Sequence, residues 1–276
     1  MHILEVIILG VIQGLTEFIP VSSSGHLIAI PFLFGWEYLG KTFDVALHLG
    51  TLVAVIVYFR HDWAAIISDF TAHIIKRTPY GKDDPEESSG RLLVPIIIAC
   101  LPAALVGFIW DDFIEQKLSV WYFVAPAMVV FGLVMLMAER IGKKHRGIGR
   151  MGYVDYLLIG CAQALALFPG VSRSGITISA GLFRGLDRAA SARFSFLLST
   201  PIIMGAGLLK FKDVFEAGLP RNEIVPFALG FVVAALSGYA AIRFLMNYLR
   251  NKPLNAFVWY RVGFAVFMVA IFLLKK

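Results

Sequence analysis

Long runs of apolar residues, separated by short polar segments, dominate the chain. Six runs are about as long as the roughly 20 residues that a helix needs to cross a bilayer. They cover residues 42–59, 91–110, 118–138, 189–209, 224–248 and 254–274. The runs do not alternate between apolar and polar positions, as the strands of a transmembrane barrel do. We therefore predict an all-α polytopic membrane protein with six transmembrane helices.

Two further apolar stretches, residues 2–36 and 153–186, are interrupted in the middle by small and polar residues, FIPVSSSGH and FPGVSRSG. Irregular backbone at membrane depth is tolerated only where protein or a cavity surrounds it. We expect both stretches to form re-entrant helix pairs that enter and leave the membrane on one side. Residues 62–77 mix apolar and charged positions and predict an interfacial amphipathic helix, followed by a polar surface loop at 78–90.

The two interrupted stretches resemble each other in sequence. Comparison of residues 10–28 with residues 160–178 gives nine identical pairs among 19 without a gap, including Gln13 with Gln163 and a shared Ser-x-Ser-Gly core. Each half then holds one re-entrant pair and three spans, and an odd number of spans inverts the second half in the membrane. We predict a single integral membrane domain over 1–276, an inverted-topology repeat with one copy at about 1–138 and the other at about 153–276.

Composition agrees with this class of protein. Apolar residues make up 58% of the chain and charged residues 16%, and the mean hydropathy is +0.76. A soluble domain carries about 25% charged residues, so a soluble enzyme is excluded as the first interpretation, as are a disordered chain and a disulfide scaffold. Cys100 and Cys161 lie in apolar runs and predict packing without a disulfide. The N-terminus shows no removable signal peptide.

The net charge of +6 could indicate a nucleic-acid partner, but the placement of the basic residues explains it better. If the N-terminus is extracytoplasmic, 16 of the 25 Lys and Arg residues fall in the cytoplasmic regions 60–91, 139–152, 184–193 and 243–252. Seven fall outside, where Asp111, Asp112 and Glu115 form an acidic loop. This distribution satisfies the positive-inside rule. We predict no nucleic-acid partner, and both termini, including Lys276, outside the cytoplasm.

Ionisable groups inside the apolar stretches are candidates for function, because they are costly in a bilayer. Glu17 is the clearest acid and Arg173 the clearest base. Across the two copies Glu17 aligns with Leu167 and Ser23 with Arg173, which indicates that the copies share a backbone shape and divide the chemistry.

The Ser and Gly residues beside these groups predict backbone N–H groups that bind an anion at a helix N-terminus. The fork of donors on Arg173 suits phosphate. Ser23, or its neighbours Ser22 and Ser24, could attack phosphorus while Glu17 takes the proton and His26 relays one.

Structural interpretations remain open beside the functional ones. Small residues in membrane helices often serve close helix packing, and a buried Glu–Arg pair can be purely structural. For Arg261 we favour snorkelling to the cytoplasmic surface. Glu139 and Asp155 lie at predicted helix ends, where we expect them to be interfacial.

Two segments then identify a resemblance. Gln13-Gly-Leu-Thr-Glu17 and the following serine-rich segment up to His26 resemble the (E/Q)xxxE and Ser/His motifs of the undecaprenyl-diphosphate phosphatase family, also called the bacitracin-resistance protein family. Pro169-Gly-Val-Ser-Arg-Ser-Gly-Ile-Thr177 resembles its PGxSRSxxT motif. The likeness covers essentially the whole chain.

The resemblance implies a bacterial inner-membrane hydrolase. Such an enzyme removes the terminal phosphate of the C55 polyprenyl diphosphate, recycles the cell-wall carrier lipid, and in excess confers bacitracin resistance. Matched by position, the catalytic residues are Glu17, Ser23, His26 and Arg173. The resemblance further implies supporting residues at Gln13, Ser22, Ser172, Ser174 and Thr177. From the Ser and Gly pattern itself we add Ser24, Gly25 and Gly175 as phosphate-binding or supporting residues.

The resemblance also implies that Mg²⁺ or Ca²⁺ assists, although the chain shows no dedicated cage of oxygen ligands. Gln13 takes the neutral alternative of the first motif position, which weakens any chelation by two carboxylates. The sequence leaves open whether the protein acts as a monomer or a homodimer. The alternative function, from a different class, is a polyprenyl-phosphate flippase or transporter, because inverted repeats with broken helices are typical of transporters.

Overall fold

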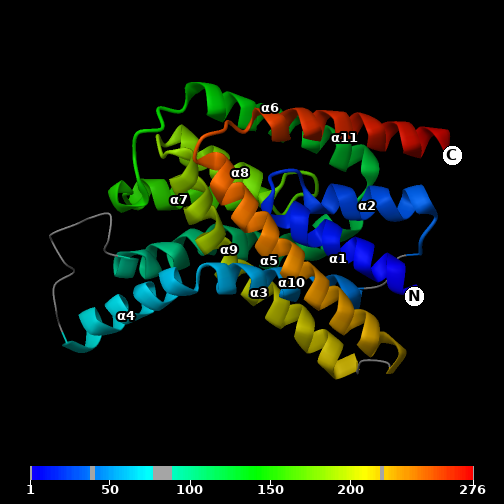
Figure 1. Ribbon diagram of the computed structural model, residues 1–276, viewed down its shortest axis with the longest axis horizontal. Coiled ribbons are helices and arrows are strands. Elements are labelled where there is room, and N and C mark those ends of the chain that lie inside the picture. Colours follow the sequence, from blue (N-terminus) through cyan, green and yellow to red (C-terminus); the bar gives the residue numbers. More distant parts are fainter. Residues whose placement is uncertain (1, 38–40, 77–88, 218–220, 276) are drawn as a thin grey trace.

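The computed structural model describes residues 2–37, 41–76, 89–217 and 221–275. The regular elements in these ranges are α-helices and two short 3-10 helices (Figure 1). In chain order they are α1 (Ile3–Phe18), α2 (Ser23–Phe34), α3 (Lys41–Tyr58), α4 (Arg60–Lys76), η1 (Ser89–Leu92), α5 (Leu93–Leu118), α6 (Trp121–Ile141), η2 (Ile148–Arg150), α7 (Tyr153–Leu165), α8 (Arg173–Phe183), α9 (Arg188–Ala217), α10 (Arg221–Leu249) and α11 (Asn255–Leu274).

Five helices, α5, α6, α9, α10 and α11, are long and apolar enough to cross a membrane. Helices α3 and α4 meet this criterion only as a pair, which is bent by 71°. The all-helical, multi-pass class of the chain is confirmed. The segment predicted as an amphipathic helix at 62–77 falls in α4. Most of the predicted 78–90 loop, the side chains of the 111–115 acidic cluster and Lys276 lie outside the described residues.

Each of the two interrupted stretches forms two helices with a short turn between them. The first break (residues 19–22) separates α1 from α2, and the second break (residues 166–172) separates α7 from α8. Pro20 disfavours helical geometry at the residue before it, and Ile19 is extended, with φ −64° and ψ 132°. Pro169 and Gly170, with φ +93° at Gly170, interrupt the second stretch.

Both breaks end on a serine in an unusual backbone conformation. Ser22 has φ 75° and Ser172 has φ 71°, and each is the N-cap residue of the following helix. Lys144 is the third non-glycine residue with positive φ in the described chain. Such a conformation is strained for a residue with a side chain and persists only where the surroundings hold it. The two copies therefore share a backbone feature that their sequence identity alone does not specify.

Several helix contacts recur when the two halves are exchanged, although others, such as that of α8 with α9, do not. Helix α1 packs on α10 as α7 packs on α5, and α3 packs on α10 as α9 packs on α5, while α3 meets α9 and α6 meets α11. Glycines permit the closest approaches: a Cβ atom at Gly14 would lie 2.0 Å from Ser237 Oγ, and one at Gly160 would lie 2.4 Å from the Ala99 carbonyl oxygen. These contacts bring the breaks together inside the bundle (Figure 1).

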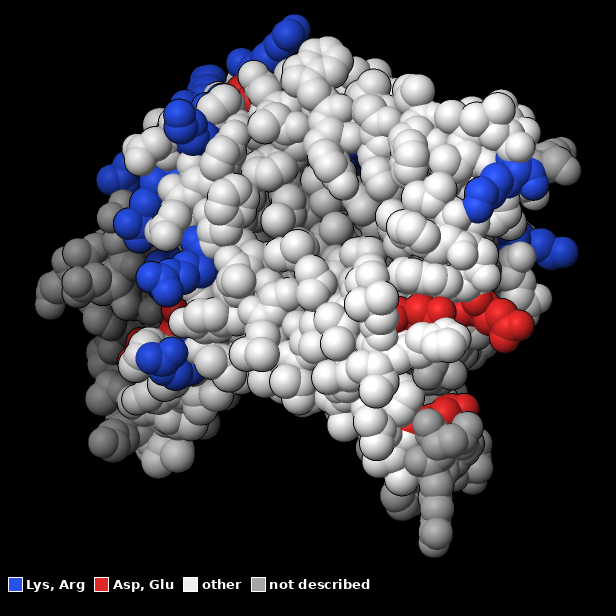
Figure 2. Space-filling model, turned by 45° about the vertical axis from the view of Figure 1, so that its right-hand side comes forward, with Lys and Arg blue, Asp and Glu red and all other residues white. Residues whose placement is uncertain are grey.

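Charge is distributed unevenly over the surface. Most of the Lys and Arg residues visible in Figure 2 gather at its left, and most of the visible face between the two ends is uncharged. The larger groups of Asp and Glu lie at the right of Figure 2, together with a few Lys or Arg residues, and both chain termini lie at the right of Figure 1. An apolar waist between charged ends is the surface that a bilayer requires.

Two acids expected at the interface are in fact buried. Glu139 is 5% and Asp155 2% exposed. Arg188 pairs with Glu139, while Arg146 and Arg184 each approach Asp155 to 2.6 Å. The acids lie near helix ends, as predicted, but arginines from other segments cover them, which a helix viewed alone does not reveal.

One cysteine expectation is also corrected. Cys100 is buried and Cys161 is exposed, and both are free. Only Cys100 therefore packs in the protein interior.

Candidate active site

The end of α1 and the start of α2 place three polar side chains in contact. Gln13 and Glu17 are four residues apart and share a helix face, and Gln13 Nε2 donates to Glu17 Oε2 at 3.0 Å. The first break reverses the chain, so that Ser23 Oγ also donates to Glu17 Oε2, at 2.8 Å. A carboxylate that accepts the hydroxyl hydrogen of a serine is placed to remove that proton when the serine attacks.

Arg173 reaches the same carboxylate from the other half of the chain. It is the first residue of α8, and its Nη2 donates to Glu17 Oε1. The side chains of Arg173 and Glu17 are 15% and 8% exposed. The structure thus brings Arg173 to Glu17 and Ser23, although Arg173 lies 156 residues from Glu17 in sequence. Further donors of the guanidinium are left for an anion.

Serines of the first break connect the two breaks directly. Ser24 Oγ accepts a hydrogen bond of 3.0 Å from the Gly170 backbone N–H and lies 3.1 Å from Ser22 Oγ. Gly25 is required here for space, because a Cβ atom would lie 2.7 Å from Met128 Sδ. These supporting residues hold the first turn of α2 against the second break.

The matching residues of the second break support the start of α8. Ser172 Oγ accepts from the Gly175 N–H at 3.2 Å, which is the ordinary N-cap bond, and lies 3.3 Å from Ser174 Oγ. Thr177 Oγ1 donates to the Arg173 carbonyl oxygen at 2.7 Å. The side chains of Ser172, Ser174 and Thr177 are bonded to local backbone or neighbouring side chains, so their role here is to shape the helix that presents Arg173.

His26 has a different environment from the one expected of a proton relay at Ser23. It is 4% exposed, and its two ring nitrogens face the Ser22 carbonyl oxygen and the Tyr260 hydroxyl, both at 2.8 Å. Its ring stacks on Phe264 with centroids 3.9 Å apart. The hydrogen bonds described for His26 do not include one to Ser23 or Glu17, so its contacts are with the first break and α11.

The prediction that Arg261 snorkels to the cytoplasmic surface is wrong. Arg261 is 0% exposed and donates to the carbonyl oxygens of Met128 at 3.0 Å, Val171 at 3.1 Å and Gly170 at 2.8 Å. Its position in an apolar run was a signal of function, but only the packing of α11 on the second break reveals its partners. Tyr260 was not singled out by the sequence.

An acid–hydroxyl pair, a guanidinium and two helix N-termini meet at breaks within a helical bundle. This defines the class: a polytopic membrane protein with an internal site built for nucleophilic chemistry on an anionic group.

Comparison with known proteins then gives the family. The family model described as bacitracin resistance protein BacA matches residues 6–267. An undecaprenyl-diphosphatase of Rubrobacter xylanophilus is 44% identical over 276 residues, covering 99% of this chain and 100% of that protein. One from Elusimicrobium minutum is 43% identical, with 98% of each chain covered. A Geobacter sulfurreducens undecaprenyl-diphosphatase is 44% identical, with 95% of each covered. The chain belongs to the BacA family.

Proposed function

We propose that the protein is an undecaprenyl-diphosphatase, a membrane hydrolase that converts undecaprenyl diphosphate and water into undecaprenyl phosphate and phosphate. Family membership supports this activity. The structural observation that carries it is the 2.8 Å hydrogen bond from Ser23 Oγ to Glu17, a carboxylate that Arg173 also contacts. A phosphoryl group beside Arg173 would lie next to both the nucleophile and its base.

The reaction proceeds in two balanced steps. Ser23 Oγ forms a bond to the terminal phosphorus as its proton passes to Glu17, and the bond to the bridging oxygen breaks, so that the lipid monophosphate leaves. Water then attacks the phosphorus of the phosphoserine and the bond to Ser23 Oγ breaks. Glu17 returns its proton to Oγ, and the water oxygen leaves with both of its protons in the released phosphate, H₂PO₄⁻. Arg173 and the N–H groups at the start of α8 hold the phosphoryl oxygens, and this positioning and charge neutralisation supply most of the rate enhancement.

A divalent cation, Mg²⁺ or Ca²⁺, is part of the proposal. Gln13 is fully buried, and its Oε1 has no hydrogen-bond partner in the described part of the chain. Oxygen atoms are the ligands these ions prefer, and Gln13 Oε1 with the Glu17 carboxylate would supply two of them. When bound, the cation would neutralise phosphate charge. One carboxylate and one amide make a weak site, so substrate oxygens must complete it.

The membrane arrangement is an inverted repeat, with the α1–α2 and α7–α8 pairs re-entering from opposite sides. The helix contacts that recur when the halves are exchanged support it. The basic end seen in Figure 2 supports a cytoplasmic location for that end, and with it our proposal that both termini lie outside the cytoplasm. We expect reporter fusions at the C-terminus to be active only in their extracytoplasmic form; a cytoplasmic C-terminus would overturn this arrangement.

Phosphate release by the purified protein tests the function. In detergent with undecaprenyl diphosphate, we expect phosphate release that rises with enzyme concentration.

The alternative function is a polyprenyl-phosphate flippase, which the two broken helix pairs favour. A flippase without hydrolysis releases no phosphate in this assay but moves labelled lipid across vesicles. Absence of release by folded protein, with and without Mg²⁺ or Ca²⁺, would exclude the phosphatase.

A further inference from the structure

Two neighbouring residues of α11, Tyr260 and Arg261, contact the two breaks from one turn of helix. Arg261 holds the second break through backbone carbonyl oxygens, and Tyr260 reaches the first break through His26. Neither residue belongs to either motif of the sequence. Neither is described in contact with Glu17, Ser23 or Arg173.

Arg261 carries a positive charge into the interior of the bundle without a carboxylate partner among the described ion pairs. Its three hydrogen bonds all go to peptide oxygens: Met128 on α6, and Gly170 and Val171 in the second break. A buried unpaired cation is costly, and the cost is offset only where hydrogen bonds satisfy it. The side chain therefore ties α6, α11 and the second break into one unit.

By fixing the direction of a peptide C=O group, Arg261 also fixes the direction of the N–H group in the same peptide unit. In a trans peptide the N–H points away from the C=O. The Val171 carbonyl faces Arg261, so the Ser172 N–H of the same peptide unit faces away from it, beside Arg173 at the first turn of α8. A cation on the oxygen also polarises that N–H as a donor. Arg261 thus orients a phosphate-binding amide without touching the phosphate.

Tyr260 orients a peptide unit of the first break in the same way, through His26 and the Ser22 carbonyl group. The Ser22 carbonyl oxygen can only accept, so His26 Nδ1 carries the proton and His26 Nε2 accepts from the Tyr260 hydroxyl. The N–H on the opposite side of that peptide unit belongs to Ser23. Ser22 and Ser172 are the strained residues with positive φ, and strain of this kind persists only when neighbours hold it.

We propose that Tyr260 and Arg261 are positioning residues of the phosphatase site, which hold the two breaks so that Ser23 and Arg173 converge on Glu17. The proposal deepens the proposed function and rests on it. In this proposal, His26 connects Tyr260 to the first break by contacting both the Tyr260 hydroxyl and the Ser22 carbonyl oxygen. Tyr260 and Arg261 lie on α11, so this helix contributes to a site whose motifs lie in α1, α2, the second break and α8.

Activity measurements separate positioning from binding. For Arg261→Lys, which keeps the charge but loses the fork, we expect kcat to fall roughly 100-fold, as misplacement of reacting groups by about 1 Å can cause, with KM changed less than about threefold. Tyr260→Phe removes one hydroxyl from a residue that is 47% exposed, and we expect kcat to fall roughly 3- to 10-fold.

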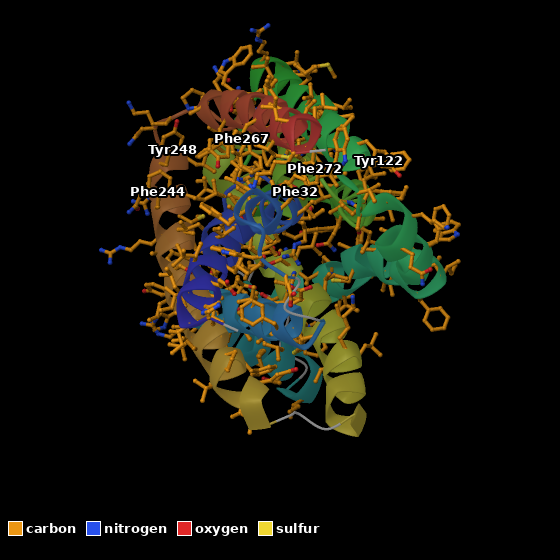
Figure 3. All side chains as sticks on the ribbon, turned by 90° about the vertical axis from the view of Figure 1, so that its right-hand side faces the viewer. Phe32, Tyr122, Phe244, Tyr248, Phe267 and Phe272 are labelled. Atoms are coloured by element: carbon orange, nitrogen blue, oxygen red, sulfur yellow. The ribbon has the colours of Figure 1, made fainter. Side chains whose placement is uncertain are left out.

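Matched controls come from residues at the surface. Arg243→Lys on α10 and Tyr122→Phe on α6 make the same chemical changes at exposed positions, and Figure 3 labels Tyr122. We expect both control variants to keep wild-type kcat. If Tyr260 acts through His26, the double variant Tyr260→Phe/His26→Phe loses no more than His26→Phe alone, whereas independent effects would multiply.

Hydrogen–deuterium exchange gives a readout that does not depend on activity. We expect faster exchange in peptides over 166–175 for Arg261→Lys and over 19–26 for Tyr260→Phe, with a peptide inside α9 unchanged. Wild-type kcat in both folded variants, or unchanged exchange at both breaks, would overturn the proposal. If the wild type itself releases no phosphate, the proposed function fails, and the exchange data still decide whether α11 holds the breaks.

Discussion

Replacement of Glu17 by glutamine tests the centre of the site, because it keeps the size of the side chain and removes its charge. Glu17 accepts hydrogen bonds from Ser23, Gln13 and Arg173, and hydrogen bonds to charged groups contribute about 1.5–3 kcal/mol each. Loss of a general base lowers the rate by about 10²–10⁴-fold, which corresponds to about 3–5 kcal/mol of barrier. We expect a loss of kcat in this range for Glu17→Gln.

Stability must be measured beside activity, because the two effects are of similar size. Glu17 and Arg173 are largely buried, and removal of one partner of a buried pair costs about 3–5 kcal/mol, since the other charge is left unpaired. The double variant Glu17→Gln/Arg173→Gln removes both charges, so its thermal unfolding midpoint in detergent should recover towards the wild type while kcat does not. Phosphate release per folded molecule separates the effects. Wild-type kcat in Glu17→Gln, or recovered kcat in the double variant, would refute Glu17 as the base.

Three further substitutions test the remaining roles. Ser23→Ala should abolish phosphate release, whereas Ser24→Ala, which removes only a link between the breaks, should reduce it by less; equal activity of Ser23→Ala and the wild type would remove the nucleophile assignment. Arg173→Lys should lower kcat/KM at least about tenfold because the planar fork is lost, and Arg173→Ala should lose more; full rescue by lysine would mean that charge alone suffices. Gln13→Glu places a second carboxylate beside Glu17, so the activity of this variant in an EDTA titration should depend more strongly on added Mg²⁺ than that of the wild type. An unchanged dependence would argue against a cation at this position.

Several features were predictable from the sequence because they depend on local patterns. The apolar runs predicted α3, α6, α10 and α11 within a few residues, and the starts of α5 and α9, which both continue eight residues beyond the predicted ends at 110 and 209. The Pro and Ser-Gly interruptions predicted both breaks. The placement of Glu17, Ser23 and Arg173 in copied segments predicted that they would meet, because copies in one bundle come together at related positions.

Other features depend on which face of each helix meets its neighbours, and the periodicity of one helix does not show this. Arg261 lies near a helix end and was expected to reach the surface, yet α11 turns it inward onto the second break. The role expected of His26 in the reaction stays a prediction, but its partners, the Ser22 carbonyl oxygen and the Tyr260 hydroxyl, were not predictable from the sequence. Glu139 and Asp155 lie near helix ends, as expected, but they are buried against Arg188 and Arg184 from α9 and the end of α8, which a single helix does not reveal.

By itself, the sequence determined a helical membrane protein, its two broken segments, its family resemblance and the candidate site residues Glu17, Ser23 and Arg173. Only the tertiary structure decided how these groups are oriented and which residues hold them. The physical reason is that apolar content and proline or glycine interruptions act within about 20 residues of chain. The peptide carbonyls of the second break, in contrast, are satisfied by Arg261 from a helix about 90 residues away, and no local pattern encodes such a partner.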